Sequence, residues 1–173
     1  MADRLRQPAN RVARAAIWLW AGRGMLSLVV IVALLTLVAW ILSQQDVPGG
    51  PMAWLSDHAW ALPSAGALVA GVPLVLVQPP YRYAVHRWEV TSDLVYTRTG
   101  WLDRRWHLVP ISRIQTVDTD RGPIERVFDL ATVRIHTASH AGSSTIEGLP
   151  LDVATELAGT LAERANGLRD DAT

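Results

Sequence analysis

The sequence predicts a membrane-anchored α+β protein, in which two transmembrane helices precede a domain of six to seven antiparallel strands that one C-terminal helix caps. Three observations support this prediction. Two uncharged apolar stretches lie in the first half of the chain, short segments of alternating polar and apolar residues follow, and the tail adopts a four-residue apolar period. The length of 173 residues leaves room for one small domain besides the spans.

The composition excludes several classes of chemistry. All 16 basic residues are arginine, and cysteine is absent. P-loop and Schiff-base lysines, thiolate nucleophiles, disulfides and Cys-ligated zinc sites are therefore excluded. The formal net charge of zero argues against a dedicated nucleic-acid binder, because such domains are strongly basic. We expect no nucleic-acid partner, no catalytic residues and no cofactor.

The first span is predicted at residues 25–42 (MLSLVVIVALLTLVAWIL), which hold no charge over 18 positions. Such a helix measures ~27 Å, close to the ~30 Å hydrocarbon core of a bilayer. A signal peptide is the rival interpretation, but its apolar region would be shorter and would end at a small-residue cleavage site. Residues 1–24 form a basic segment before the span, in which residues 11–20 form either a short interfacial helix or an ordinary lead-in.

The second span is predicted at residues 59–77, which are also uncharged but include two prolines. Gly66 with Ala70, and Ala67 with Gly71, form two small-xxx-small pairs that let another helix approach closely. The partner of this helix-packing face is either the first span or another subunit.

The distribution of charge predicts the orientation of the spans. Five arginines precede the first span, the connection at residues 43–58 holds two aspartates and no arginine, and Arg82 and Arg87 follow the second span. Because positively charged flanks stay in the cytoplasm, we expect both termini inside and residues 43–58 outside, as a short extracytoplasmic loop.

The cytoplasmic domain is predicted at residues 79–167, with Pro79-Pro80 as its boundary and residues 168–173 as a disordered tail. Alternation and turn-forming clusters predict strands at 83–90, 94–99, 104–109, 114–118, 131–137 and 143–147. Val153, Leu157 and Leu161 then recur at four-residue steps, between Pro150 and Gly167, which suit a helix start and a helix end.

The domain resembles the bacterial pleckstrin-homology (PH) domain of the YdbS-like family of membrane proteins. The resemblance rests on VPISRIQTVDTDRGPIERVFDLATVRIHTAS and IEGLPLDVATELAGTL, with matching positions at Pro110, Arg113, Ile114, Gln115, Gly122, Pro123, Arg126, Phe128, Leu130, Ala131, Val133, Ile135, Thr137 and Ala138. Asp129 stands where the family usually has glycine. The resemblance implies a PH-like β-sandwich or barrel without a shared catalytic site, in the cytoplasmic membrane of a bacterium.

The candidate contact surface is the basic first half of the domain, because residues 81–113 hold six arginines against three acids, whereas residues 114–173 hold five arginines against ten acids. The anionic lipid of the cytoplasmic leaflet attracts arginines near its surface. The candidate contact residues are Arg82, Arg87, Arg98, Arg104, Arg105, Arg113, Trp101 and Trp106. His136 and His140 would lie ~13 Å apart on a strand, too far to share a metal ion, so we expect no metal site.

The sequence therefore favours a non-enzymatic membrane protein whose PH-like domain binds a membrane-protein partner, a second copy of itself or the lipid surface, either alone or as a subunit of a membrane assembly. The alternative is an accessory component of a transport or enzymatic membrane complex. The two predicted spans contain no ionisable residue, which a proton or ion pathway normally needs.

Overall fold

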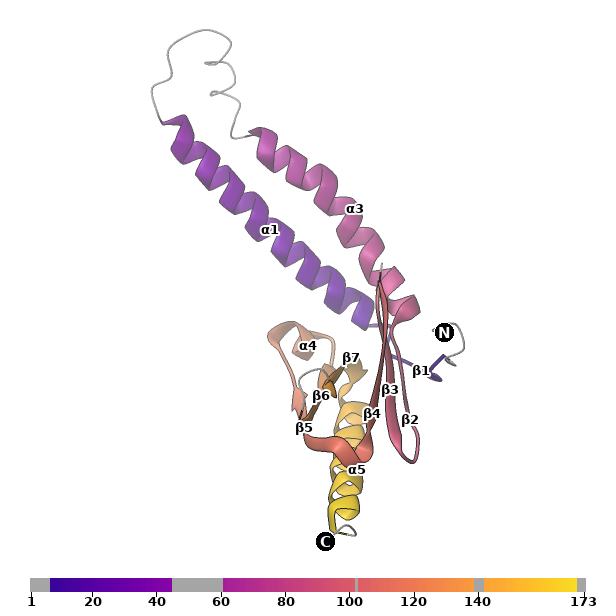
Figure 1. The fold of residues 1–173 in the computed structure, drawn as a ribbon. Coiled ribbons are helices and arrows are strands. Elements are labelled where there is room, and N and C mark those ends of the chain that lie inside the picture. The colour runs from indigo at the N-terminus through magenta and orange to yellow at the C-terminus, as the bar shows by residue number, and fades with distance from the viewer. Residues whose placement is uncertain (1–6, 45–60, 102, 139–141, 171–173) are drawn as a thin grey trace. The chain divides into compact units, whose positions relative to one another are not determined.

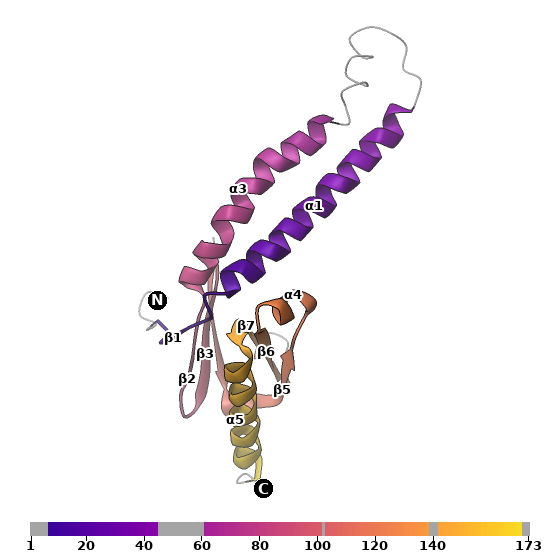
Figure 2. The ribbon, with the colours of Figure 1, turned by 180° about the vertical axis from the view of Figure 1, so that it is seen from behind.

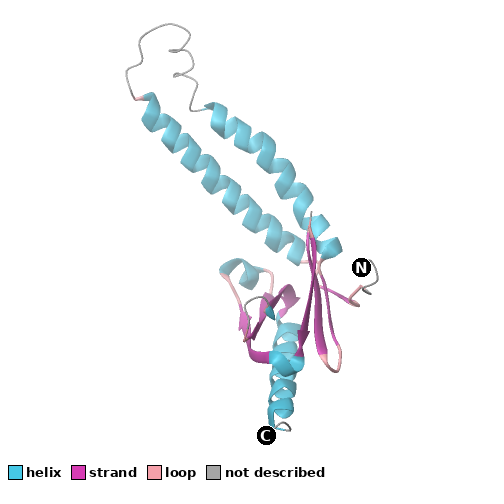
Figure 3. Ribbon diagram, in the orientation of Figure 1, coloured by secondary structure: helices cyan, strands magenta, loops and turns pink. Residues whose placement is uncertain are grey.

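The computed structural model describes residues 7–44, 61–101, 103–138 and 142–170. The chain divides into two compact units, one formed by Trp20–Gln78 and the other by the segment up to Leu19 together with Pro79–Thr173 (Figure 1). Helices alone make up the described part of the first unit, and all the strands belong to the second (Figure 3). Most of the predicted extracytoplasmic loop lies outside the described residues.

Two long apolar helices confirm the predicted pair of spans. Helix α1 covers Ala16–Ser43 and helix α3 covers Ala61–Val85. Both are long and apolar enough to cross a membrane, with an 18-residue window of mean hydropathy 2.6 within Ala16–Ile41 and one of 1.7 within Ala61–Val85. Residues 11–20 form no separate interfacial helix, because Arg11 lies in a strand and α1 already begins at Ala16.

Helix α3 continues through Pro79-Pro80, so the prediction of a strand from residue 83 was wrong for residues 83–86. Contacts beyond the prolines hold these last turns. Tyr81 lies edge-on to Trp101, with ring centroids 6.4 Å apart, and His86 N–H donates to the Arg82 carbonyl at 2.7 Å. Tertiary packing here overrides the helix-breaking tendency of proline.

The first sheet has four antiparallel strands in the order β1-β2-β3-β4, formed by Asn10–Arg11, Arg87–Val90, Leu94–Gly100 and Arg104–Pro110. The strand β1 was not predicted: the chain before the first span pairs with β2, Asn10 opposite Trp88. This segment is part of the domain core, because Val12, Ala16 and Leu19 are buried.

The second sheet has three antiparallel strands in the order β5-β6-β7, formed by Ile114–Asp120, Leu130–Thr137 and Ser144–Pro150. A short 3₁₀ turn, η2 (Ile111–Arg113), leads into β5. Buried hydroxyls connect the two sheets, since Thr97 Oγ1 on β3 lies 2.9 Å from Ser144 Oγ on β7. The sheets and the C-terminal helix confirm the predicted fold class.

The C-terminal helix α5 covers Leu151–Asp170 and lies across the three-stranded sheet (Figure 2). Its buried stripe consists of Ala154, Leu157, Leu161 and Ala165, which are spaced by three or four residues as an amphipathic helix requires. The helix continues past its predicted end at Gly167, because Gly167 does not adopt the left-handed backbone that ends many helices.

The segment at residues 121–129, between β5 and β6, has a structural role. It forms helix α4 (Pro123–Val127), where the buried Glu125 accepts hydrogen bonds from Gly122 N–H at 2.6 Å and Thr132 Oγ1 at 2.7 Å. Asp129 adopts a left-handed backbone with φ of 52°. This conformation explains why glycine suits the position in the family that the sequence resembles.

Candidate functional site

The outer face of the four-stranded sheet brings two of the candidate arginines together with a tryptophan. Arg98 on β3 lies directly opposite Arg87 on β2 and Trp106 on β4. Residues opposite one another in an antiparallel sheet project to the same face. Val95 and Val109 belong to the other face and are buried in the core. We call Arg87, Arg98 and Trp106 the basic row.

Arg98 is the buried centre of the basic row. The residue is only 6% exposed, and its Nε donates to the carbonyl of Val85, the last residue of α3, at 3.0 Å. A guanidinium at this place complements the negative end of the helix dipole. Burial lowers the pKa of Arg98, and the positive charges of Arg87 and Arg104 lower it further. The row therefore concentrates like charges.

The two outer members of the row carry shielded donors. Arg87 and Trp106 are half-buried, and neither Arg87 Nε nor Trp106 Nε1 finds a hydrogen-bond partner among the described residues. Most buried polar atoms in proteins have a partner, so two such donors on one face call for an explanation.

The remaining predicted contact residues are dispersed. Arg104 and Arg113 are exposed, and Arg104 shares the outer face of the sheet with the row. Arg105 belongs to the opposite face and pairs with Asp103 at 3.0 Å. That pair is highly exposed, so its net contribution to stability is small.

Arg82 and Trp101 do not join the row. Arg82 Nη2 lies 3.1 Å from Glu147 Oε2 in a half-buried ion pair, and Trp101 contacts Tyr81. The sequence alone could not separate these residues from the row, because which arginines share a face depends on strand register.

A polar cavity of about 240 Å³ lies beside the Arg82–Glu147 pair. Sequence reasoning missed it, because α3, β3, β4 and β7 contribute its residues. Its lining consists of Arg82, His86, Thr99, His107, residues 143–145 and Glu147. Burial lowers the pKa of His86 to about 4; the positive charge of Arg82 acts in the same direction and Glu147 opposes it. His86 is therefore neutral near pH 7.

The predicted helix-packing residues separate into two sides of α3. A Cβ added to Gly71 would overlap Leu28 Cδ1, whereas one added to Gly66 would meet nothing within 4 Å. Ala70 is exposed and Ala67 is half-buried. Thr36 Oγ1 and Ser64 Oγ lie 2.7 Å apart and add a hydrogen bond between the helices.

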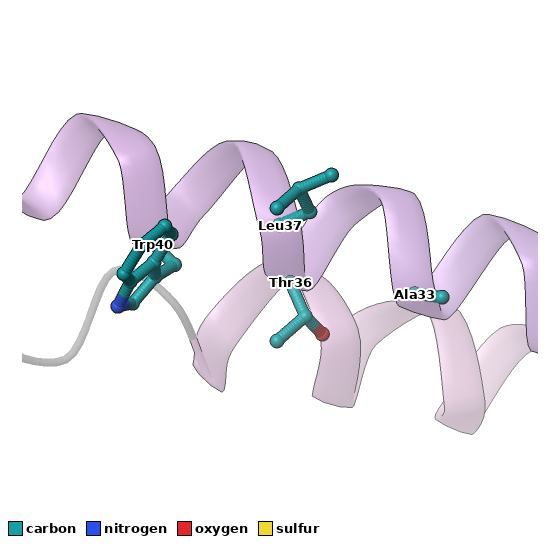
Figure 4. A pocket seen from close by; sticks show the side chains of 4 residues that line it. All are labelled: Ala33, Thr36, Leu37 and Trp40. Atoms are coloured by element: carbon teal, nitrogen blue, oxygen red, sulfur yellow. The ribbon is translucent and has the colours of Figure 1, made fainter.

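An apolar groove of about 450 Å³ on the helical unit is lined by Ala33, Thr36, Leu37 and Trp40 (Figure 4). Its lining offers one hydroxyl, which already bonds to Ser64 and to the Val32 carbonyl. The described part of its lining therefore shows no arrangement suited to catalysis.

The described residues hold no group of three or more side chains suited to a metal ion. His140 lies outside them, and His136 Nε2 lies 3.3 Å from Asp118 Oδ2. Arg121 bonds to Asp129 Oδ1 at 2.6 Å, and Arg126 is exposed on α4.

Comparison with known proteins gives a consistent assignment. The family described as Bacterial PH domain matches residues 12–165. The chain is 31% identical over 118 residues to the transmembrane protein YdbS of Bacillus subtilis strain 168, a match that covers 68% of this chain and 70% of that protein. No solved structure matches. The family match begins before the first span, in agreement with the part that Val12 plays in the domain core.

Proposed function

Because the chain belongs to the bacterial PH domain family and carries two apolar helices, we propose that it is a non-enzymatic membrane protein whose PH-like domain is a binding module at the cytoplasmic leaflet. The domain binds the anionic lipid surface or a membrane-protein partner through the outer face of its four-stranded sheet. A second copy of the chain is a partner of the same kind.

The observation that carries this proposal is the composition of that outer face. The described residues of β1 to β4 place four arginines on it, Arg11, Arg87, Arg98 and Arg104, against one carboxylate, Glu89. Half-buried Tyr96 and Trp106 and the exposed Leu108 accompany them. Arginine and aromatic residues are enriched where proteins meet partners, and arginine is attracted to anionic leaflets.

The proposed orientation has both termini in the cytoplasm. The domain includes the chain on both sides of the helical hairpin, since β1 pairs with β2, so these two parts of the chain lie on one side of the membrane. The arginines that flank the spans support the cytoplasmic side.

Co-purification tests the proposal. The tagged full-length protein is extracted in mild detergent, and proteins and lipids retained at near-stoichiometric amounts are identified by mass spectrometry. We expect wild type to retain one membrane protein or anionic phospholipid. The Arg11→Glu, Arg104→Glu double variant, which changes two exposed arginines of the outer face, should lose it while remaining folded.

The matched control is Arg134→Glu, since Arg134 is a similarly exposed arginine on the other sheet. A double variant that retains everything wild type retains would exclude the outer face of the sheet as the contact. A substrate turned over by the purified protein would instead favour the enzymatic or transport alternative.

A further inference from the structure

The basic row contains hydrogen-bond donors that have no acceptor among the described residues. Guanidinium and indole groups donate hydrogen bonds and accept none. Arg87 Nε and Trp106 Nε1 are shielded and donate to no group among the described residues. Among the described residues, Arg98 donates through Nε to the Val85 carbonyl, so its terminal N–H groups remain available to other acceptors.

Local charge supports the same ligand class. Arg98 lies between Arg87 and Trp106, and Arg104 precedes Trp106 by two positions on the same face. The one carboxylate that the described strands place on this face, Glu89, already accepts the N–H of Ala9 at 3.0 Å. An oxyanion would relieve the repulsion among these guanidinium groups and supply hydrogen-bond acceptors, which this face lacks.

We propose that the basic row binds a tetrahedral oxyanion of the phosphate class, supplied by an anionic phospholipid headgroup or by soluble phosphate. This inference rests on the proposed function, since it assigns the ligand of that surface. Arginine is suited to the ligand because its planar fork can donate two parallel hydrogen bonds to phosphate oxygens. Trp106 adds a single directed donor, which makes the site more than a diffuse positive surface.

Position along the chain makes a headgroup accessible. Val77 is the last residue of the predicted second span, and Arg87 follows ten residues later. A site tethered so close to a span meets a high effective concentration of headgroups, so modest intrinsic affinity is sufficient.

The indole N–H resonance of Trp106 tests the site directly. The ¹⁵N-labelled full-length protein is studied in uncharged maltoside micelles without phosphate, and Trp106→Phe assigns the resonance. Inorganic phosphate is added in one arm and phosphatidylglycerol in the other. We expect the resonance to shift in at least one arm, and the responding arm identifies the source of the anion. Arg87→Gln should weaken binding and raise the apparent Kd about tenfold or more, because hydrogen bonds to charged groups are strong.

The control is Arg113→Gln, since Arg113 is exposed and lies outside the four-stranded sheet. If the resonance shifts in neither arm, the proposal is overturned. It is also overturned if Arg87→Gln leaves the apparent Kd unchanged, or if Arg113→Gln raises the apparent Kd as much as Arg87→Gln does. The outcome is separable from that of the co-purification experiment. If the basic row binds phosphate but the double variant still retains its partner, the proposed function is contradicted and the phosphate site is not.

Discussion

The backbone N–H of Ala13 donates to the Gly148 carbonyl at 2.9 Å, which joins the segment before the first span to β7. Next to Ala13, Val12 is buried, and Arg11 pairs with Arg87 in the sheet. The PH-like domain is therefore assembled from both sides of the helical hairpin. A fragment that begins at Pro79 would lack this edge strand and these core side chains.

The core position of Val12 leads to a stability prediction. We expect Val12→Asp to destabilise the domain by about 2–4 kcal/mol, because it buries a carboxylate without a partner. The measurement is the apparent Tm of the full-length protein in detergent, followed by near-ultraviolet circular dichroism. Gln7→Asp is the control, since Gln7 is exposed in the same segment. Equal Tm values for both variants would mean that the segment is not part of the folding unit.

The left-handed backbone of Asp129 leads to a second prediction. Asp129→Gly should leave the apparent Tm unchanged or raise it, because glycine adopts φ of 52° without strain and the exposed pair with Arg121 contributes little. Asp129→Ala should lower stability by about 1 kcal/mol, since it keeps the strained backbone and loses the pair. If the alanine variant is as stable as the glycine variant, the turn is not left-handed in solution.

Elements with a local signal were predictable from the sequence. Alternation in residues 94–99 and 131–137 and the four-residue period of the tail depend on neighbouring residues alone. Strand β1 has only two residues and exists because β2 pairs with it. Helix α3 persists beyond Pro79-Pro80 through contacts such as Arg98 with the Val85 carbonyl, which join distant parts of the sequence.

Of the candidate site, only the excess of positive charge was predictable from the sequence. The excess of arginine in residues 81–113 is evident in the sequence, but strand register decides that Arg98 lies between Arg87 and Trp106 while Arg105 belongs to the other face. The polar cavity depends on four elements meeting around His86, for which the sequence contains no local pattern.

Burial of His86 predicts a pH dependence of stability. The pKa of His86 is lowered from 6.5 to about 4 in the folded protein. Between these values the unfolded chain binds a proton that the folded chain does not, so stability falls as the pH falls from about 6.5 to about 4. The loss attributable to this group reaches roughly 3 kcal/mol at the acidic end.

Variants isolate the contribution of His86. His86→Asn should flatten the decrease of apparent Tm between pH 7 and pH 4.5, whatever its effect at pH 7. Thr116→Asn is the control and should keep the wild-type slope, since Thr116 is exposed and carries no ionisable group. A wild-type slope in His86→Asn would assign the acid sensitivity to other groups.

The two sides of helix α3 lead to a final prediction about the spans. Gly71 lies against Leu28, whereas a Cβ added to Gly66 would meet nothing within 4 Å. Gly71→Leu should therefore separate α1 from α3 and cost about 1–3 kcal/mol of hairpin stability, as overpacking of a close contact does. The identical change at Gly66 should leave the hairpin intact, because a side chain added there meets no neighbour. It is a matched control, since both variants replace a glycine of the same helix with leucine.

Unfolding of the full-length protein in mixed detergent and SDS micelles, followed by helical circular dichroism, checks this difference. Gly71→Leu should unfold at a lower SDS fraction than wild type, and Gly66→Leu should match wild type. Thr36→Val should shift the Gly71→Leu midpoint less than the wild-type midpoint, since separation of the helices already breaks its 2.7 Å hydrogen bond to Ser64. Greater sensitivity at Gly66 would instead place the helix contact on the opposite side of α3, and a concentration-dependent midpoint would indicate that a second copy occupies that side.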